Sequence, residues 1–400
     1  MWLAVVSLVY VGGTVAMATG VGRAPGATPA ASPGPGAAQD LERQSPPLQV
    51  AVGLLHGDPA LAGPSGGVDT VTRDGRSYHV ISFGPVAPYL AFAPVPALWD
   101  SAPWVISLAF GLLAALLAWP LASRYGPGGP ATVWLATLGA LGTILLPLAI
   151  QGNYYYLAHA EAMAATIVAL LEWRGRRRPW VLGLCFGLAA LARPTVLLAA
   201  IPFGLFTLAG SRTRIRAALA FAAPIGLVLA VMGVYNLARF GSPLESGYTV
   251  AILHNQQLIA ARRVGTFSIH HVRHNLSILL AGGFRISPAF PFLVPSSYGQ
   301  SILLTTPAFL LALRAGFRDR TAVLLWLSAA IVTVPLLLHY GGAGYRTYGY
   351  RYFLDVTPFL LALVAMAARH GFGRLSKGLI ALSVAFCLYG VAWAVRMGHS

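Results

Sequence analysis

Three carboxylates near the start of the chain have the chemistry of a general base. Asp58 lies in LLHGDPAL (54–61), and Asp69 and Asp74 lie in DTVTRDGRSYHVISFGPVAPYL (69–90). A carboxylate can take a proton from a hydroxyl group that attacks another molecule. Asp-Pro and Asp-Gly are also common in ordinary solvated turns, which is the structural alternative. We interpret Asp58 and Asp74 as the candidate bases.

A second candidate pair occurs in YYYLAHAEA (154–162), at the start of an apolar stretch. His159 and Glu161 are two residues apart, roughly 200° around a helix, so they cannot share one face. Ionisable side chains inside a membrane are costly and usually face a polar cavity. A shallow, water-exposed helix end is the alternative. We predict a catalytic role for Glu161 and a substrate-binding role for His159.

Basic residues crowd together in SIHHVRHNL (268–276). The i,i+4 spacing of His270 and His274 is too weak a pattern to predict a metal site. One interpretation is an amphipathic helix on a membrane surface. The other is contact of Arg273 and His274 with phosphate oxygens, because arginine offers forked donors to phosphate.

Arginines and tyrosines alternate in HYGGAGYRTYGYRYFLDVTP (339–358). If this stretch is helical, Arg351 and Asp355 are at i and i+4 and are expected to form an ion pair. Alternatively, Arg346 and Arg351 bind a lipid phosphate while Tyr350 and its neighbours stack on a sugar. Tyrosines are common at membrane interfaces regardless of function.

The elements that must position these residues are apolar helices. The chain has 400 residues, of which 57% are hydrophobic and 10% charged, against about 25% charged in soluble domains. We therefore predict an all-α membrane protein, a polytopic bundle of about ten or eleven transmembrane helices. Of the 27 basic residues all but Lys377 are arginines between apolar stretches. They are expected to fix topology, and a nucleic-acid partner is excluded. Cys185 and Cys387 are expected to be buried thiols.

The chain is expected to form a single domain over 1–400. A first helix covers 1–20, with a signal peptide as the alternative, and a first outer loop covers 21–100. A second outer loop covers 238–298, and juxtamembrane helices are expected in these loops. The remaining helices are predicted over 101–122, 130–150, 157–172, 179–192, 194–210, 215–237, 299–314, 320–339, 352–369 and 376–396.

The stretch 179–210 is predicted to be a hairpin. Arginine clusters lie before and after it, at 174–178 and 212–216, and both should remain in the cytoplasm. The chain should therefore turn back near Arg193-Pro194, because proline disfavours helical geometry in the residue before it. With this hairpin, the short loops that hold about half of the 27 basic residues lie inside, and most carboxylates lie at the outer face.

Several segments together resemble one bacterial family, the multipass C-class (GT-C) glycosyltransferases that include protein mannosyltransferases and lipid-A aminoarabinose or galacturonic-acid transferases. The resemblance runs through nearly the whole chain in order. Its segments are LLHGD (54–58), DGRSYHVISFGPVAPYL (74–90), YYYLAHAEA (154–162), RRRPWVLGLCFGLAALARPTVLL (176–198), YNLARFGSPLESGY (235–248), RHNLSILL (273–280), PFLVPSSYGQSILLTTPAFL (291–310) and GYRYFLDVTPFLL (349–361).

The resemblance implies a membrane enzyme that transfers a sugar, with inversion, from a polyprenyl-phosphate donor to a glycan, lipid or protein acceptor. The reaction would take place at the outer face of a bacterial cytoplasmic membrane. The resemblance also implies substrate-binding roles for His56 and Tyr78. No cofactor is predicted with certainty, and a divalent metal is possible.

One departure from the family pattern matters. Related sequences carry an acidic residue shortly before the Leu-His-Gly element, where this chain has Val50-Ala51-Val52-Gly53. Asp40, Glu42, Asp58 or Glu161 could replace it, or catalysis could be lost in a partner subunit of the same fold. A transporter or flippase of an amphipathic substrate is the remaining alternative, although matched broken helices in both halves are missing.

Overall fold

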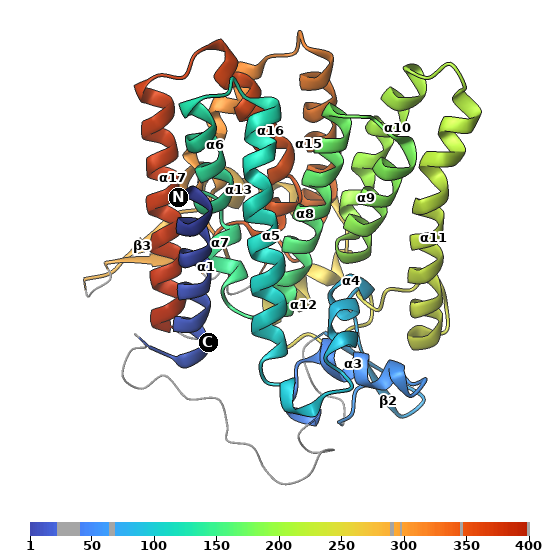
Figure 1. The fold of residues 1–400 in the computed structure, drawn as a ribbon. Coiled ribbons are helices and arrows are strands. Elements are labelled where there is room, and N and C mark those ends of the chain that lie inside the picture. The colour runs from blue at the N-terminus through green and yellow to red at the C-terminus, as the bar shows by residue number, and fades with distance from the viewer. Residues whose placement is uncertain (22–40, 64–68, 289–291, 297, 345–346, 398–400) are drawn as a thin grey trace.

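The computed structural model describes residues 1–21, 41–63, 69–288, 292–296, 298–344 and 347–397. Most of these residues form helices that run side by side, and the first long segment, which precedes α5, gathers at one end of this bundle (Figure 1). Apolar side chains from α1 to α17 form one continuous core. The predicted helical bundle is confirmed.

The bundle helices follow the apolar stretches of the sequence. They are α1 (Trp2–Thr19), α5 (Ala102–Tyr125), α6 (Pro130–Leu141), α7 (Leu145–Ala149), α8 (Tyr154–Arg174), α9 (Pro179–Ala192), η3 (Pro194–Ala199), α10 (Ala200–Ala209), α11 (Arg214–Phe240), α14 (Ile302–Thr305), η5 (Pro307–Ala315), α15 (Arg320–Leu338), η6 (Arg351–Asp355), α16 (Thr357–Ala367), η7 (Ala368–His370) and α17 (Arg374–Met397).

Five helices in the described part of the chain are long and apolar enough to cross a membrane. They are α1, α5, α11, α15 and α17. Many of their large apolar side chains are exposed, for example Leu219 and Leu227 of α11 at 66% and 67%. Such a surface suits lipid as the surrounding solvent. The total number of spans stays a prediction.

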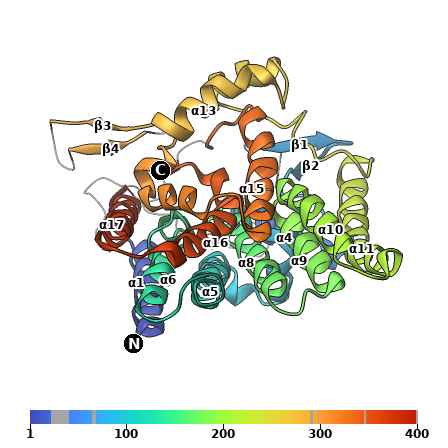
Figure 2. The same cartoon turned by 90° about the horizontal axis from the view of Figure 1, so that it is seen from above.

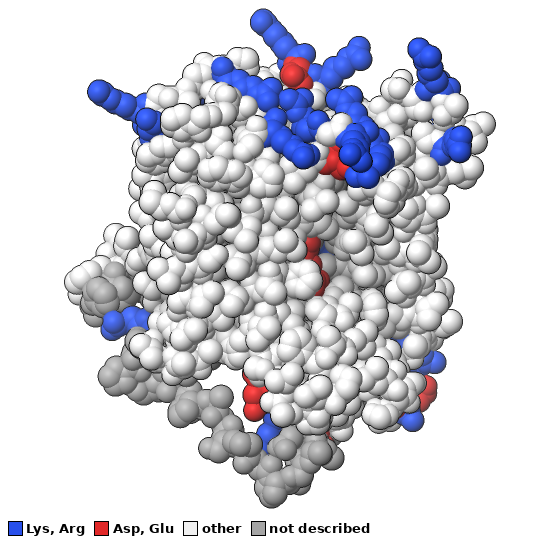
Figure 3. All heavy atoms as spheres, viewed as in Figure 1, with Lys and Arg blue, Asp and Glu red and all other residues white. Residues whose placement is uncertain are grey.

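Loops between consecutive helices bring the arginines to one end of the bundle. The connections α5–α6, α8–α9, α10–α11, η5–α15 and α16–α17 lie at the upper end of Figure 1. In Figure 3 the same end carries most of the visible Lys and Arg, whereas the middle of the molecule is almost free of charge. We call it the arginine end. This distribution is typical of proteins that follow the positive-inside rule.

The expected hairpin lies between α9 and α10. The helix α9 ends at Ala192, and the chain reverses at Arg193 so that η3 packs back along α9. At Gly84, an added Cβ would lie 2.6 Å from the Ala192 Cα atom, so only glycine allows the short helix α4 (Phe83–Val86) to contact this turn. Small residues at contacts let membrane helices approach closely.

The first long segment folds against the end of the bundle opposite the arginines. It contains α3 (Pro46–Leu55), the strands β1 (Thr70–Arg73) and β2 (Arg76–His79), α4, η1 (Ala87–Ala91) and η2 (Pro96–Leu98). The two strands pair antiparallel around Asp74-Gly75, both at positive φ, as a tight hairpin turn requires. The part of this segment just before α5 is helical only in the short pieces η1 and η2.

A buried arginine holds this segment to the bundle. Arg239 at the end of α11 is 1% exposed. Its guanidinium donates to the carbonyl oxygens of His79 and Ile81 and to Asn236 Oδ1, and it stacks 3.6 Å from the Tyr235 ring centroid. The position of β2 therefore depends on one side chain of α11.

The second long segment forms helices and a small hairpin along one side of the bundle (Figure 2). It contains α12 (Gln256–Arg263), η4 (Ile269–His271), α13 (Val272–Ala281), β3 (Phe284–Ile286) and β4 (Leu293–Pro295). The strands β3 and β4 pair antiparallel. Figure 2 shows α13 lying across the edge of the bundle, with β3 and β4 projecting beyond it.

Replacing Arg239 should release the first long segment. Arg239→Met removes the charge and its hydrogen bonds and should cost about 3 kcal/mol, since buried carbonyl groups are left without donors. We expect a lower melting temperature in detergent and faster tryptic cleavage after Arg73 or Arg76. Arg216→Met, at the exposed other end of α11, is the matched control. Equal cleavage in both variants would contradict the anchoring role.

Candidate functional site

A buried carboxylate joins three parts of the bundle. Asp355 of η6 has a side chain that is 0% exposed, and its Oδ1 lies 2.9 Å from Nδ1 of His159 on α8. Its Oδ2 lies 3.0 Å from Nη2 of Arg193 and accepts a 2.9 Å hydrogen bond from the Thr195 hydroxyl. Both carboxylate oxygens are therefore satisfied, as a charge in an apolar interior requires.

The expected ion pair between Arg351 and Asp355 is not formed. Residues 351–355 adopt a 3-10 helix, in which each residue turns by about 120°, so i and i+4 lie on different sides. Asp355 consequently faces Arg193 and His159, and Arg351 faces away from it.

Arg351 lies among tyrosine rings instead. Its guanidinium carbon is 5.5 Å from the ring centroid of Tyr155, 5.8 Å from that of Tyr156 and 5.0 Å from that of Tyr352. Its Nε–H is buried and has no acceptor among the described residues. The tyrosine faces stabilise the positive charge, and one donor, Nη2, bonds to the Tyr352 hydroxyl at 3.3 Å.

A carboxylate of the first long segment reaches the same tyrosines. Asp69 Oδ2 accepts a 2.7 Å hydrogen bond from the Tyr155 hydroxyl. Burial raises the pKa of Asp69, while this bond and the nearby charges of Arg351 and Arg262 lower it. The structure records no ion pair between Asp69 and Arg351 in the part of the chain that it describes.

The backbone of Asp69 is held in an unusual conformation. Its φ is +60°, a region that aspartate visits more readily than most residues. Its N–H donates to the carbonyl oxygen of Ile252, and its own carbonyl accepts from Val80. Segments from both long stretches of the chain thus fix this carboxylate, a feature found often at functional sites.

His79 is a neutral ring that contacts Tyr154, the neighbour of Tyr155. Burial, with help from Arg239, lowers the pKa of His79 to about 3. Its Nδ1 accepts from the Ile81 N–H, so the proton of the neutral ring is on Nε2, which lies 3.2 Å from the Tyr154 hydroxyl. The ring centroids of Tyr154 and Tyr155 are 4.3 Å apart, with the ring planes tilted by 33°. We call the whole assembly the polar cluster: Asp69, Tyr155, His159, Arg193, Thr195, Arg351, Tyr352 and Asp355.

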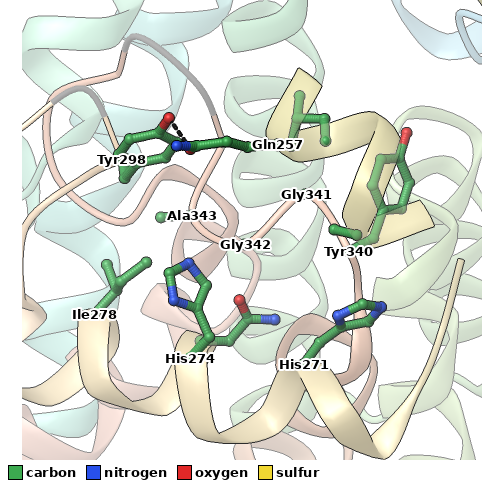
Figure 4. A pocket seen from close by; sticks show the side chains of 13 residues that line it. Gln257, His271, His274, Ile278, Tyr298, Tyr340, Gly341, Gly342 and Ala343 are labelled. Carbon is green, nitrogen blue, oxygen red and sulfur yellow. Dashed lines mark hydrogen bonds between the residues drawn. The ribbon is translucent and has the colours of Figure 1, made fainter. Parts of the chain in front are cut away.

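A cavity of about 180 Å³ lies beside the polar cluster, between α12, α13 and residues 340–344. Figure 4 shows His274 projecting from α13 into it, with Gln257 bonded to Tyr298 across the cavity. Tyr340 lines the cavity and lies within electrostatic range of Asp69. A Cβ on Gly344, another lining residue, would lie 2.4 Å from Arg351 Nε. Arg351 is therefore not itself a lining residue but packs directly against Gly344 in the cavity wall.

The predicted bases Asp58 and Asp74 lie elsewhere. Asp58 pairs with Arg76 at 2.9 Å, and Asp74 pairs with Arg73 at 3.3 Å with 83% of its side chain exposed. Neither contacts the polar cluster. A shallow groove of the first long segment includes Asp58 and Arg76.

The other predicted residues divide between the cluster and its surroundings. His159 and Arg351 belong to the polar cluster, and His274 lines the adjoining cavity. Outside both lie the exposed His56 and Arg273, and Tyr78, which is buried against Phe240. Also outside lies Tyr350, which is fully buried and whose hydroxyl has no partner among the described residues. Arg346 lies outside the described residues.

Glu161 occupies the other side of α8 from His159, as its spacing predicted. It is 8% exposed, and neither carboxylate oxygen has a hydrogen-bond partner in the described ranges of the chain. Its electrostatic neighbour is Tyr89 of η1. The structure therefore separates Glu161 from the polar cluster.

Sequence reasoning missed Arg193 and Tyr155 and did not single out Asp69. A signal existed for Arg193, because an arginine at a hairpin tip between two apolar half-helices must find a partner or a polar cavity. The position of Asp69 depends on Arg239 and on the second long segment, which no local pattern reveals. No family model, curated protein or solved structure matches the chain.

Removing the charge of Asp355 should destabilise the bundle. Asp355→Asn leaves Arg193 as a buried charge without a counter-ion, at a cost of about 3 kcal/mol. A lower melting temperature in detergent is expected. Asp100→Asn is the control, because Asp100 is exposed and accepts one bond from Gln44. A melting temperature for Asp355→Asn as high as that of the control would show that the carboxylate is not ionised.

Proposed function

We propose that the chain is an inverting membrane glycosyltransferase. It takes a sugar from a polyprenyl-phosphate donor and passes it to an acceptor at the outer face of a bacterial cytoplasmic membrane. The observation that carries this proposal is that Asp69 and Arg351 both contact Tyr155. Asp69 accepts a hydrogen bond from its hydroxyl, and the Arg351 guanidinium lies over its ring. A base and a phosphate-binding cation are the two groups that such a transfer needs.

Arg351 has the properties of the phosphate-binding group. Its Nε–H is buried without an acceptor among the described residues, and it lies against the wall of a cavity. An arginine offers forked donors that match phosphate oxygens. His274 and Tyr340 line the same cavity and could contact the sugar or its phosphate.

Asp69 has the properties of the base. It comes from the first long segment, in which no carboxylate stands just before Leu55-His56-Gly57. Burial raises the pKa of Asp69, so its carboxylate is a stronger base than an exposed aspartate. In the transfer, the acceptor oxygen bonds to the anomeric carbon while the bond from that carbon to the phosphate oxygen breaks. The electron pair of the broken bond goes to the phosphate, whose charge Arg351 stabilises, and the acceptor's proton goes to Asp69.

The first test is loss of the base. Asp69→Asn should lower sugar transfer at least about 100-fold, which is a common contribution of a general base. Transfer is measured in membranes with a panel of polyprenyl-phosphate hexoses and pentoses. The melting temperature and the binding of polyprenyl phosphate by the purified protein should persist.

A double variant, Asp58→Ala with Asp74→Ala, separates the two base assignments. We expect it to retain transfer, because both side chains lie in exposed ion pairs. Loss of transfer in this variant, with full transfer in Asp69→Asn, would move the base to the exposed turns. Full transfer in both would remove a base role from all three carboxylates.

The pH dependence gives a second test. Transfer requires ionised Asp69, so the rate should rise with pH through its raised pKa. The Tyr155 hydroxyl donates to the ionised carboxylate and lowers this pKa. Tyr155→Phe should therefore move the acid limb of the kcat/KM profile to higher pH. A profile that does not move, or moves to lower pH, would contradict the assignment.

A further inference from the structure

A long basic stretch follows the last helix of the first half of the bundle. Residues 246–318 contain no Asp and no Glu. Arg263, Arg273 and Arg285 all have exposed side chains there. A surface segment with exposed cations and no acid of its own favours an anionic partner.

This stretch is fixed at the end of a candidate membrane span. Asn275 Nδ2 donates to the carbonyl oxygens of Leu337 and His339, and the Ser268 N–H donates to the Leu338 carbonyl. These acceptors terminate α15, one of the five long apolar helices. The helix α13 therefore lies at the depth where that span ends, which is the depth of lipid headgroups.

The exposed face of α13 carries both apolar and basic side chains. Leu276 and Leu280 are 39% and 49% exposed on one side, with Ile269 of η4 continuing the row at 72%. Arg273 is also exposed and lies in the same row, three residues before Leu276, and exposed His274 follows it. A helix at this depth with exposed apolar and basic side chains is typical of an interfacial helix.

The hairpin of β3 and β4 extends the same surface sideways. In Figures 1 and 2 it projects sideways beyond the bundle, where its Phe284 packs on Phe386 and Tyr389 of the candidate span α17, so lipid would surround it in a membrane. Ile286, Phe292 and Leu293 are 88%, 56% and 43% exposed, next to Arg285. A two-stranded hairpin is marginal in water, and burial of these side chains in lipid would stabilise it.

We propose that these residues form a binding surface for anionic phospholipids, independent of the sugar-transfer activity. The arginines bind headgroup phosphates, and the apolar side chains enter the upper part of the acyl chains. A phospholipid fits because exposed cations and exposed apolar side chains occur together in this stretch, and α13 lies at the end of a span. We call it the headgroup surface: Arg263, Ile269, Arg273, Leu276, Leu280, Arg285, Ile286 and Phe292.

Site-specific fluorescence in nanodiscs tests the proposal. In a background with Cys185→Ala and Cys387→Ala, Ile286→Cys is labelled with an environment-sensitive fluorophore. Each nanodisc preparation contains one spin-labelled lipid, either phosphatidylcholine or phosphatidylglycerol. The spin label is high on the acyl chain, and the labelled lipid is present at the same mole fraction in both preparations. Both lipids should quench the fluorophore, and phosphatidylglycerol should quench it at least about twofold more, because cations enrich anionic lipid locally.

Two charge variants separate the headgroup surface from general electrostatics. Arg263→Gln, Arg273→Gln and Arg285→Gln together should abolish the excess quenching by phosphatidylglycerol and leave quenching by phosphatidylcholine. Arg212→Gln, Arg214→Gln and Arg216→Gln at the arginine end are the matched control and should leave the excess unchanged. Phe292→Cys repeats the measurement if the first label disturbs folding.

Equal quenching by the two lipids in the native-charge protein would overturn the anionic preference. Quenching by neither lipid would overturn the whole proposal, since the hairpin would then be covered by water or by a second copy of the chain. A label at Asp74, whose side chain is 83% exposed at the tip of another hairpin, should not be quenched.

Discussion

The arrangement depends on one charge that has to be neutralised inside an apolar bundle. Asp355 is completely buried and has its partners on α8, at the α9–η3 turn and on η3. An uncompensated carboxylate in such surroundings would cost several kcal/mol. These contacts therefore fix the positions of η6, α8 and the α9–η3 turn relative to one another. Tyr352 and Arg351 precede Asp355 on the same short helix and are positioned with it. The ion pair of Asp355 with Arg193 therefore fixes the position of Arg351, to which we assign substrate binding.

The sequence predicted the helices well because lipid-facing helices need long apolar stretches, which are visible without any tertiary information. The turn at Arg193 followed from proline and from arginines on both sides. The predictions of helix boundaries and helix type were wrong where tertiary packing determines them. The stretch expected as one helix over 130–150 is divided into α6 and α7 around Gly142 and Thr143, and the stretch over 299–314 is largely a 3-10 helix. Two small β-hairpins in the long segments were not expected either.

The site was predictable only in part. His159 and Arg351 stood out because ionisable groups beside membrane helices are costly and are kept for a reason. Asp69 was passed over for Asp58 and Asp74, because nothing in its local sequence, Asp69-Thr70, distinguishes it as a base. Their difference arises from contacts distant in the sequence: Tyr155 and Ile252 hold Asp69, and Arg239 holds the neighbouring strand. The partner of Asp355 was also wrong, because an i,i+4 rule for α-helices was applied to a 3-10 helix.

A cryo-electron microscopy map of the protein in nanodiscs with bound polyprenyl phosphate tests the central claim most directly. The account predicts phosphate density at hydrogen-bond distance from Arg351, in the cavity next to Tyr340, with the Asp69 carboxylate facing the space beside it. Phosphate bound away from Arg351, or Asp69 turned into bulk water with no contact to Tyr155, would contradict it.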